Sequence, residues 1–542
     1  MSWLGSRDAR SQEIPFGLLL TAAQKRSLAL SASIEEALRA TAVCAAEQLR
    51  YTNPKFSAAT LSGRANMCPL LFGLLAILAL FTIPSTIALC LLALLPIGYR
   101  ILVVSQFRSS QNESPLACSV SALDHGLPVY TIIAPLHREA RVVDQLLSAI
   151  ESLNYPAAKL DVILVVEADE PLTRAAITAR QHRIPITVVP APPSEPRTKP
   201  KALNIALSLA RGTFTVIYDA EDRPEPDQLL HALGAFCLSG DELACVQARL
   251  HTDTMGSWLA RYFTAEYAAH FDVFLPKLAA LGLPLPLGGS SNHFRTAILR
   301  EIGCWDAYNV TEDADLGIRL ARFGYRCGVI NSTTHEEAPT AIRVWIRQRS
   351  RWFKGWMQTW LVHMRDPYKL YRDLRMRGFI AFQLIVGGSA MVALIHPILL
   401  IGAVWSAFAS HVLGDDPGNP IRPVACVAAI IGSYLPTICL GWIGLYRRRI
   451  PRRLSTLACT PFHWLLVSVA AWRAAIELII APFHWNKTEH ALDRTDTITP
   501  ALLDLTRQLG DLKEAGELLQ IQAGAKDSAA NLPPIPREIV SG

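Results

Sequence analysis

The run TFTVIYDAED, residues 213–222, joins an apolar strand pattern to a cluster of acids, and it decides the fold together with its neighbours. Three similar runs precede it: VYTIIAP at 129–135, DVILVVEAD at 161–169 and ITVVPA at 186–191. Stretches with helical periodicity, such as EARVVDQLLSAIESL and KALNIALSLARG, separate them. Strands that alternate with helices form a mostly parallel, doubly wound sheet. We therefore predict a globular α/β domain over residues 127–365.

The composition points to a membrane. Hydrophobic residues make up 51% of the chain and charged residues only 18%, which is too apolar for a purely soluble enzyme of this length. Residues 70–104 carry a single charge and are interrupted at Pro84 and Ser85, which predicts two short spans or a kinked hairpin. After the α/β domain, apolar runs recur at 378–413, 421–446 and 457–485. We expect two spans here and a less certain third, since Arg473 lies in the last run.

Charges in the connections set the expected orientation. The loop YRRRIPRR, residues 446–453, is densely basic, whereas the connection HVLGDDPGNP has no Lys or Arg, so the positive-inside rule places the first in the cytoplasm and the second outside. The α/β domain then also lies in the cytoplasm. The predicted organisation is a helical cytoplasmic region at 1–66, a transmembrane hairpin at 70–104, the α/β domain at 127–365, transmembrane or interfacial helices at 378–485, and a partly disordered cytoplasmic tail at 491–542.

Cysteine spacing and net charge exclude several classes of protein. The eleven cysteines are scattered, with no CxxC pair and no His/Cys cluster at zinc spacing, so neither a disulfide framework nor a zinc site is predicted. The formal net charge is only +6, and no long basic tract is flanked by aromatic residues. A nucleic-acid partner is therefore not expected.

Two groups of acids follow predicted strands. Glu167 and Asp169 come after one strand, and Asp219, Glu221 and Asp222 come after another. Ligands of open α/β sheets bind at the carboxyl ends of the strands, so these acids could share one crevice. Their oxygens suit Mg²⁺ or Mn²⁺, which would also hold a diphosphate. For either group alone, ordinary solvated loop acids are the alternative.

Two further motifs follow. In VTEDADLGIRLARFGYR, residues 310–326, helix capping by Thr and the early acids is the simple interpretation, and it accounts for Thr311 and Asp315 but not for the motif that follows. The segment Gln348-Arg349-Ser350-Arg351-Trp352 then lies in a cationic, Trp-rich helical pattern that is typical of a membrane interface.

The order DAED, TED and QRSRW resembles family 2 glycosyltransferases of the cellulose-synthase and hyaluronan-synthase kind over about residues 127–490. Within them it is most similar to bacterial synthases like the phage-N4 adsorption protein B and to exopolysaccharide or mixed-linkage β-glucan synthases. The resemblance implies a nucleotide-diphospho-sugar transferase (GT-A) domain flanked by transmembrane helices. It also implies an inverting, processive, multi-pass enzyme of a bacterial inner membrane, which passes a growing β-linked glycan through the lipid bilayer. UDP-glucose is the first expectation for a UDP-sugar donor, and Mg²⁺ or Mn²⁺ is the expected cofactor.

The resemblance also implies roles for individual residues. They are Pro135, Glu139 and Asp169 for the nucleotide, Lys199 and Lys201 near its diphosphate, Asp219 with Glu221 or Asp222 for the metal, Asp313 as the base, Glu312, Gln348, Arg351 and Trp352 for the acceptor and diphosphate, and Lys487 and Thr488 in a gating loop. An interfacial Trp/Lys anchor is an equal alternative for the last pair.

The chemistry is consistent with these roles. An inverting transfer needs one carboxylate to take the proton of the attacking hydroxyl, and Asp313 at a helix start would be suitably fixed. A guanidinium such as Arg351 can hold phosphate oxygens, and an indole such as Trp352 can stack on a sugar ring.

Other segments and functions stay open at this point. We expect PLGGSSNHFR, residues 286–295, to be a plain turn, although a loop near the acceptor is possible, and His335 to be structural, although it and Glu336 could approach the acceptor. A non-processive transferase acting on a lipid carrier and an inert receptor that binds a signalling nucleotide are the alternative functions. The sequence names no export or regulatory partner.

Overall fold

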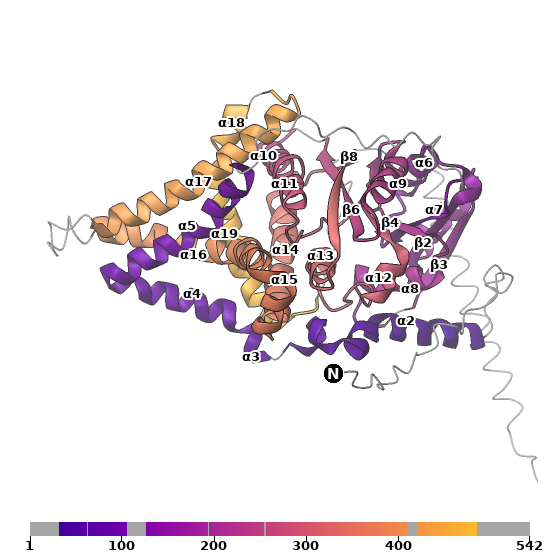
Figure 1. Ribbon diagram of the computed structural model, residues 1–542, viewed down its shortest axis with the longest axis horizontal. Coiled ribbons are helices and arrows are strands. Elements are labelled where there is room, and N and C mark those ends of the chain that lie inside the picture. The colour runs from indigo at the N-terminus through magenta and orange to yellow at the C-terminus, as the bar shows by residue number, and fades with distance from the viewer. Residues whose placement is uncertain are drawn as a thin grey trace, which may run out of the picture. The chain divides into compact units, whose positions relative to one another are not determined.

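The computed structural model describes residues 32–61, 63–105, 126–192, 194–253, 256–408, 421–451 and 453–484. Its centre is an eight-stranded sheet in the order β3-β2-β1-β4-β7-β6-β8-β5 (Figure 1). The strands are β1 Tyr130–Leu136, β2 Leu160–Glu167, β3 Ile186–Ala191, β4 Phe214–Ile217, β5 Arg223–Pro224, β6 Leu243–Thr252, β7 Asn292–Arg295 and β8 Arg326–Glu336.

The predicted parallel sheet is confirmed, with antiparallel additions. Strands β1 to β4 pair in parallel, and so do β6 and β8. Strand β7 runs antiparallel between β4 and β6, and the short β5 pairs antiparallel with β8. The first three predicted strands agree with the structure to within two residues. The fourth is shorter than expected, because residues 219–222 form a turn in which the carboxylate of Asp222 accepts a hydrogen bond from the amide of Asp219 (2.7 Å).

Helices cover the sheet and complete the α/β domain. They are α6 Val143–Glu151, α7 Pro171–Ala179, α8 Lys199–Leu209, α9 Gln228–Ser239, α10 Trp258–Tyr267, the π-helix η6 Ala268–Phe274, α11 Leu275–Ala280, α12 Thr296–Glu301 and α13 Glu312–Arg322, with a short 3₁₀ turn η5 at Ala157–Lys159. The first two strands are fully or almost fully buried, which is why their sequences are continuous apolar runs and not alternating patterns.

The remaining elements precede and follow this domain. Before it come α2 Ala32–Thr52, η1 Pro54–Phe56, η2 Ala58–Thr60, α3 Gly63–Asn66, α4 Cys68–Leu78, η3 Ala79–Phe81 and α5 Ile83–Ser105; after it come α14 Ile342–His363, α15 Pro367–Phe382, η7 Gln383–Gly387, α16 Gly388–Phe408, α17 Ile421–Arg447, α18 Arg453–Leu457 and α19 Thr460–Ile480.

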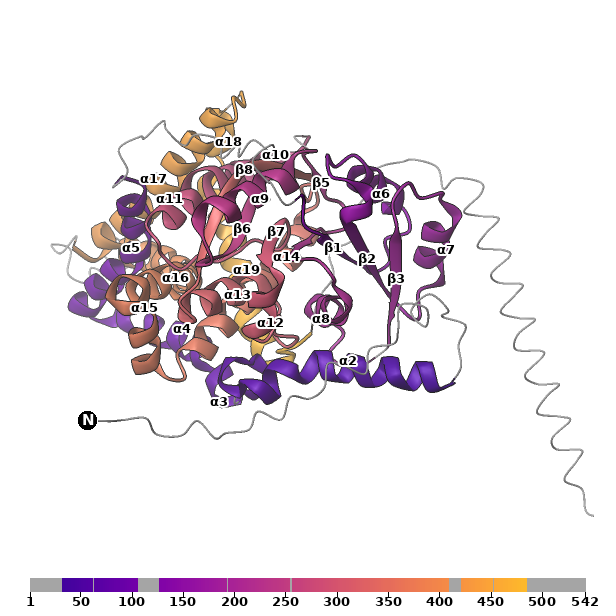
Figure 2. The same cartoon turned by 45° about the vertical axis from the view of Figure 1, so that its right-hand side comes forward.

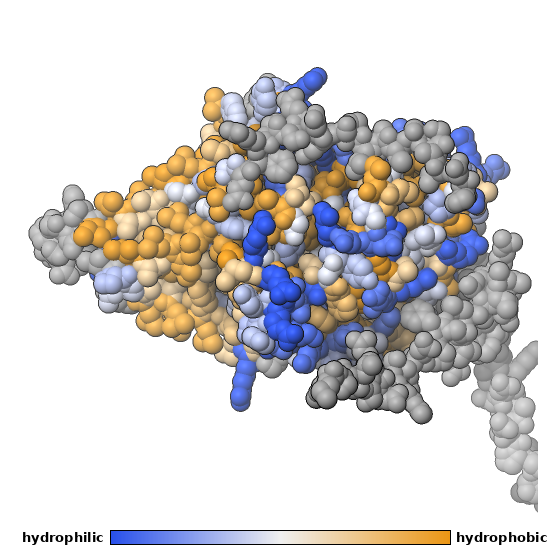
Figure 3. Space-filling view, viewed as in Figure 1, coloured by the Kyte–Doolittle hydropathy of each residue, from blue (hydrophilic) through white to orange (hydrophobic). Residues whose placement is uncertain are grey.

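Four of the described helices are long and apolar enough to cross a membrane. They cover Pro84–Ser105, Pro367–Trp405, Ile421–Arg447 and Thr460–Ile480. Figure 3 shows apolar side chains gathered over the part of the surface that α4, α5, α16 and α17 form. The last helix contains Arg473, whose guanidinium donates to Glu477 one turn later (2.7 Å), so its charge has a partner on the same helix. The predicted hairpin divides into the shorter α4 and the long α5, with the break at residues 79–82.

The N-terminal helix α2 packs on the α/β domain. Figure 2 shows it alongside α8, with which it is in contact. The amide nitrogen of Asn204 on α8 donates to the carbonyls of Ala45 (2.9 Å) and Trp305 (2.8 Å). Farther along, the buried carboxylate of Asp306 accepts from the hydroxyl of Ser57 (3.1 Å) and the amide of Ala58 (2.6 Å). Residues 42–60 therefore help to hold the loop that leads into α13.

Candidate active site

The turn after β4 sorts its three acids by exposure. Asp222 has no exposed surface, and its Oδ2 accepts from the Asp219 amide and from the hydroxyl of Ser290. Burial, together with the negative charges around it, raises the pKa of Asp222 well above its usual range. Asp219 and Glu221 are only partly buried. Asp222 is therefore the internal acceptor of the turn, and the other two acids are the ones available to a ligand.

Lys199, the first residue of α8, connects this turn with a second acidic group. Its ammonium contacts the carboxylate of Asp219 and donates to the carbonyl of Gly289 (2.6 Å). Burial opposes the charge on Lys199, but attraction by Asp219, then Glu312 and Asp313, outweighs it and raises the pKa of Lys199. One cation thus faces acids that lie more than ninety positions apart in the sequence.

Glu312 and Asp313 are the first two residues of α13. Burial raises the pKa of Glu312 to about 8, and the charge of Asp313 adds to this shift. Burial also raises the pKa of Asp313, whose Oδ1 accepts from the amide of Ala314 (2.8 Å). The positive charges of Lys199 and Arg351 act in the opposite direction and offset part of this rise in the pKa of both acids. The structure therefore brings the predicted metal acid, base and diphosphate arginine into one electrostatic neighbourhood.

Helix α14 packs tightly against the residues just before α13. A Cβ on Gly355 would lie 2.1 Å from the hydroxyl oxygen of Thr311, so only glycine permits this approach. The side chain of Gln358 accepts from the amide of Val310 (3.1 Å), and Asn309 donates to Thr359 (3.0 Å). These contacts fix the helix that carries Arg351 relative to the acids at the start of α13.

The same face of α14 also binds the segment that directly follows α19. The ammonium of Lys354, which is 1% exposed, donates to the carbonyls of His484 (2.7 Å) and Ala481 (3.2 Å), and Gln358 donates to the carbonyl of Pro482 (2.9 Å). Burial is the main reason that the pKa of Lys354 falls to about 8. The predicted gating residues Lys487 and Thr488 lie just beyond, outside the described residues.

Trp352 forms part of an aromatic wall beside this site. Its ring lies 6.1 Å from the ring of Phe263 and 6.4 Å from that of Tyr267, and the guanidinium of Arg349 lies 4.5 Å over it. Arg349 in turn pairs with Glu266 (2.7 Å). The preceding Gln348 is half-buried, and its Oε1 has no hydrogen-bond partner among the described residues.

The residues predicted for the nucleotide lie at the ends of β1 and β2. Pro135 is half-buried near the end of β1 and Glu139 is buried just after it. Asp169 pairs with Arg197 (3.0 Å). Lys201 is fully buried and donates to the carbonyls of Ser194 (2.7 Å) and Pro192 (3.3 Å), so it does not share the place of Lys199 beside Asp219.

The structure adds residues that the sequence analysis did not select. The loop at 286–295, expected to be a plain turn, supplies the Gly289 carbonyl to Lys199 and the Ser290 hydroxyl to Asp222. Glu336, at the end of β8, has its pKa raised to about 8 by burial and then by the charge of Glu221. The paired glycines and serines directly before a strand are the signal that could have identified the loop.

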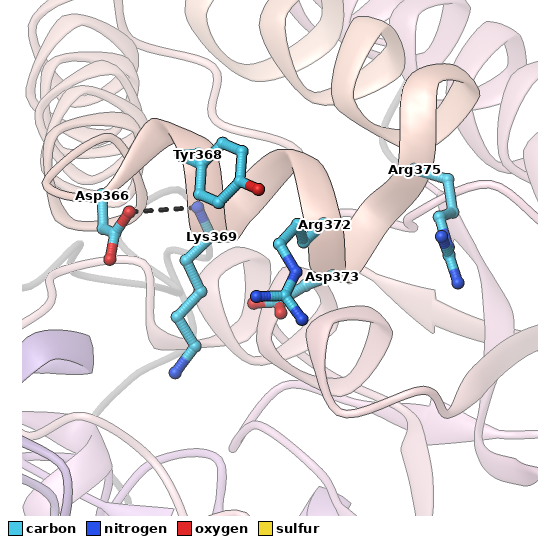
Figure 4. A pocket seen from close by; sticks show the side chains of 6 residues that line it. All are labelled: Asp366, Tyr368, Lys369, Arg372, Asp373 and Arg375. Atoms are coloured by element: carbon cyan, nitrogen blue, oxygen red, sulfur yellow. Dashed lines mark hydrogen bonds between the residues drawn. The ribbon is translucent and has the colours of Figure 1, made fainter.

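A separate hollow of about 420 Å³ lies on α15 (Figure 4). It is lined by Asp366, Tyr368, Lys369, Arg372, Asp373 and Arg375. Asp366 caps the helix by accepting from the amide of Lys369 (3.0 Å), the dashed contact in Figure 4. None of the predicted site residues lines this hollow, so it is not part of the candidate active site.

The partly buried acids Asp219 and Glu221 offer carboxylate oxygens, as a hard divalent cation requires. The ammonium of Lys199 contacts the Oδ1 of Asp219, so the other carboxylate oxygen, Oδ2, is the one that a cation would use. Asp222 is less suitable, since its Oδ2 is occupied within the turn. The site therefore fits Mg²⁺ or Mn²⁺ held by Asp219 and Glu221.

Comparison with known proteins places this geometry in context. The sequence model of the family described as glycosyl transferase family group 2 matches residues 214–485. The model of glycosyl transferase family 2 matches residues 131–294. The "Probable glycosyltransferase YdaM" of Bacillus subtilis (strain 168) is 25% identical over 258 residues, which are 45% of this chain and 59% of that protein.

Two other relatives carry names that refer to a glycolipid and to a polysaccharide. The "Beta-monoglucosyldiacylglycerol synthase" of Nostoc sp. (strain PCC 7120 / SAG 25.82 / UTEX 2576) is 24% identical over 388 residues, 67% of this chain and 77% of that protein. The "Probable glucomannan 4-beta-mannosyltransferase 1" of Arabidopsis thaliana is 24% identical over 258 residues, 46% of this chain and 44% of that protein.

Proposed function

Since the chain belongs to glycosyl transferase family group 2 and is a glycosyltransferase that uses a nucleotide sugar, we propose that it extends a β-linked polysaccharide at a membrane with inversion at the anomeric carbon. One observation carries the proposal. The ammonium of Lys199 contacts Asp219 and the Gly289 carbonyl, the carboxylate of Asp313 faces Gly289, and the charges of Lys199 and Arg351 act on Glu312 and Asp313. Helix α14, which carries Arg351, also packs along the apolar helix α19.

Asp313 is the proposed general base. It lies at the start of α13, where the amide of Ala314 holds its Oδ1. The other carboxylate oxygen, Oδ2, lies 3.3 Å from the position that a Cβ on Gly289 would occupy, so the acid faces the loop that Lys199 also binds. A carboxylate fixed in this way takes the proton of the attacking hydroxyl as that oxygen forms the new glycosidic bond.

The leaving diphosphate would lie among the cations. Asp219 and Glu221 would hold Mg²⁺ or Mn²⁺, and the ion when bound offsets the charge that develops on the leaving group. Lys199 and Arg351 contribute positive charge that acts on Glu312 and Asp313. Pro135, Glu139 and Asp169 at the ends of β1 and β2 would face the nucleotide, as carboxyl strand ends do in this class of fold.

The acceptor end is assigned to α14. Trp352 offers an indole beside the aromatic rings of Phe263 and Tyr267, and such faces stack on sugar rings. Because α14 packs on α19, a chain that leaves this wall would enter the apolar helices. This arrangement is consistent with repeated addition and export through the membrane. The charges of the connecting loops favour a cytoplasmic α/β domain, and the resemblance to polysaccharide synthases, not the geometry, favours a bacterial inner membrane and makes UDP-glucose the first donor to test.

A transferase that adds one sugar to a membrane lipid is the second candidate. It is favoured by the match to the "Beta-monoglucosyldiacylglycerol synthase" of Nostoc, which covers 67% of this chain. The two functions share the donor site and the base, and they differ in the acceptor. The size of the product separates them.

The test uses the full chain, purified in detergent and reconstituted into lipid nanodiscs. Release of nucleoside diphosphate is followed with UDP-glucose, UDP-N-acetylglucosamine and GDP-mannose, each with Mg²⁺ or Mn²⁺ and again after chelation. Asp313→Asn should abolish turnover and leave nucleotide binding largely intact, whereas Asp241→Asn, at a fully exposed acid, should leave turnover unchanged. Long glycans support the polymerase, and single additions to lipid support the second candidate. Full activity of Asp313→Asn would remove Asp313 from the mechanism, and no turnover with any donor would reject both functions.

A further inference from the structure

Three side chains with metal-binding atoms converge at the ends of β6 and β8. His251 and His335 are register partners on these adjacent parallel strands, and Asp253 follows directly after β6. One ligand atom from each residue lies within 4.8 Å of the other two. The Oδ1 of Asp253 is 2.7 Å from the Nδ1 of His335 and 3.5 Å from the Nδ1 of His251. Both imidazoles therefore present the same ring nitrogen to the same carboxylate oxygen.

The second oxygen of Asp253 is held from the other side. Arg223 on β5 is the register partner of His335 and pairs with the Oδ2 of Asp253. Carboxylates that bind metals are commonly oriented by such an outer hydrogen bond. Arg223 thus fixes the carboxylate with Oδ1 turned toward the two imidazoles, and it does not occupy the oxygen that a cation would use.

The hydrogen bond between Asp253 and His335 leaves the Nδ1 of the third residue of the cluster, His251, without a partner at hydrogen-bond distance in the described part of the chain. The Nδ1 of His251 is shielded from solvent, and its neighbour among the described residues, the Oδ1 of Asp253, lies 3.5 Å away, too far for a hydrogen bond of ordinary geometry. A polar ring nitrogen in that position normally has a partner. An ion held jointly by the two Nδ1 atoms and Oδ1 would supply it.

We propose that His251, Asp253 and His335 form a binding site for a divalent transition-metal ion, with Zn²⁺ as the best-fitting member of the class. Two imidazoles and one carboxylate suit Zn²⁺, Co²⁺ or Ni²⁺ better than Mg²⁺, which prefers oxygen ligands. Three protein ligands leave a fourth position for water. The site is chemically distinct from the all-oxygen pair Asp219 and Glu221.

The location gives the ion a structural consequence. Glu336 follows His335 directly, and burial, together with the negative charges of Glu221 and Asp219, raises the pKa of its carboxyl group. An ion bound by residues at the ends of β6 and β8 would therefore hold these two strand ends together, close to Asp219 and Glu221 of the proposed donor site. His251 and Asp253 lie more than eighty positions from His335, which is why no zinc spacing is visible in the sequence.

The test measures metal binding and not turnover. The full chain in detergent is stripped with a chelator and titrated with Zn²⁺ against a chromophoric competitor, with excess Mg²⁺ present to occupy the all-oxygen site. We expect one tight Zn²⁺ equivalent, and a loss of affinity greater than about 100-fold in His335→Ala and in His251→Ala, because even outer-shell changes cost about 10- to 100-fold. Arg223→Gln should fall in that smaller range, and His182→Ala, at an exposed histidine, should bind as the unaltered chain does.

Two measurements keep the result decisive if an alanine variant folds poorly. Asp253→Asn preserves the size of the side chain and should also lose the tight equivalent, with at most a small fall in melting temperature in the absence of metal, because the pairs with Arg223 and His335 are weakened. Titration with Co²⁺ should give the visible absorption of a four-coordinate imidazole site in the unaltered chain and not in Asp253→Asn. Equal Zn²⁺ affinity in the unaltered chain, His251→Ala and His335→Ala, or no tight Zn²⁺ binding at all, would overturn the proposal.

Discussion

Gly355→Ala tests whether the approach of α14 to the start of α13 sets the geometry of the active site. A Cβ at this position would lie 2.1 Å from the Oγ1 of Thr311, whereas ordinary contact begins at 3.4 Å. The helix would have to move away by the difference, about 1.3 Å. Arg351 lies one turn earlier on the same helix and would move with it. A misplacement of about 1 Å can lower a rate by about 100-fold, so we expect a fall of that order in kcat.

The assay is donor turnover at saturating substrate, measured together with the melting temperature. Overpacking costs about 1–3 kcal/mol of stability, and alanine recovers up to about 1 kcal/mol of it through its helix propensity. The melting temperature should therefore fall modestly while kcat falls severely. Gly63→Ala is the matched control, since a Cβ there meets no atom within 4 Å.

A second substitution identifies the cause. In Gly355→Ala combined with Thr311→Ala, the atoms at 2.1 and 2.5 Å are removed and the nearest remaining atom lies 2.7 Å away, so activity should return in part. If Gly355→Ala keeps the full kcat and melting temperature, the close packing of these two segments does not control the site. The same holds if Gly63→Ala is equally damaging.

Three further substitutions test other contacts. Lys199→Met removes a charge that lowers the pKa of Asp313, so the pKa of Asp313 should rise. The ascending limb of the pH dependence of kcat should then move to higher pH by about one unit. An unmoved limb would show that Lys199 does not act on the base. Asp306→Asn weakens the hydrogen bonds to residues 57–58 and should lower stability by about 1–3 kcal/mol, seen in thermal unfolding, and an unchanged transition would count against this anchor. The native pKa of Lys354, about 8, lies below the 10.5 of an ordinary lysine. The unfolded chain therefore holds more protons between these two values, and the native state gains stability as the pH rises through them. Lys354→Met should abolish that gain in melting temperature, and an identical pH dependence in both proteins would refute it.

Much of the architecture could be predicted because it depends on local patterns. Continuous apolar runs identified the buried strands, and apolar runs located the regions of the four helices that could span a membrane. The sequence alone predicts two short spans or a kinked hairpin at 70–104 and only two secure spans after the α/β domain, because Arg473 lies in the last run. The order of the acidic and QRSRW motifs indicated a glycosyltransferase, which the family match confirms. The length of β4 was wrong, because a side-chain hydrogen bond within the DAED turn ends the strand early, and strand periodicity does not report such bonds.

The arrangement of the site required the tertiary structure. Lys199 and Lys201 read alike in the sequence, yet two residues of a helix are separated by about 200° around its axis, so one reaches Asp219 and the other is buried against a loop. Likewise, the role of Asp222 within its turn and the contribution of Ser290 depend on which strands are neighbours. The sequence by itself determined the elements and their chemical groups, because periodicity and turn propensity act over a few residues. Only the pairing of β6 with β8, and the packing of α14 on the start of α13, decided which of those groups lie close together.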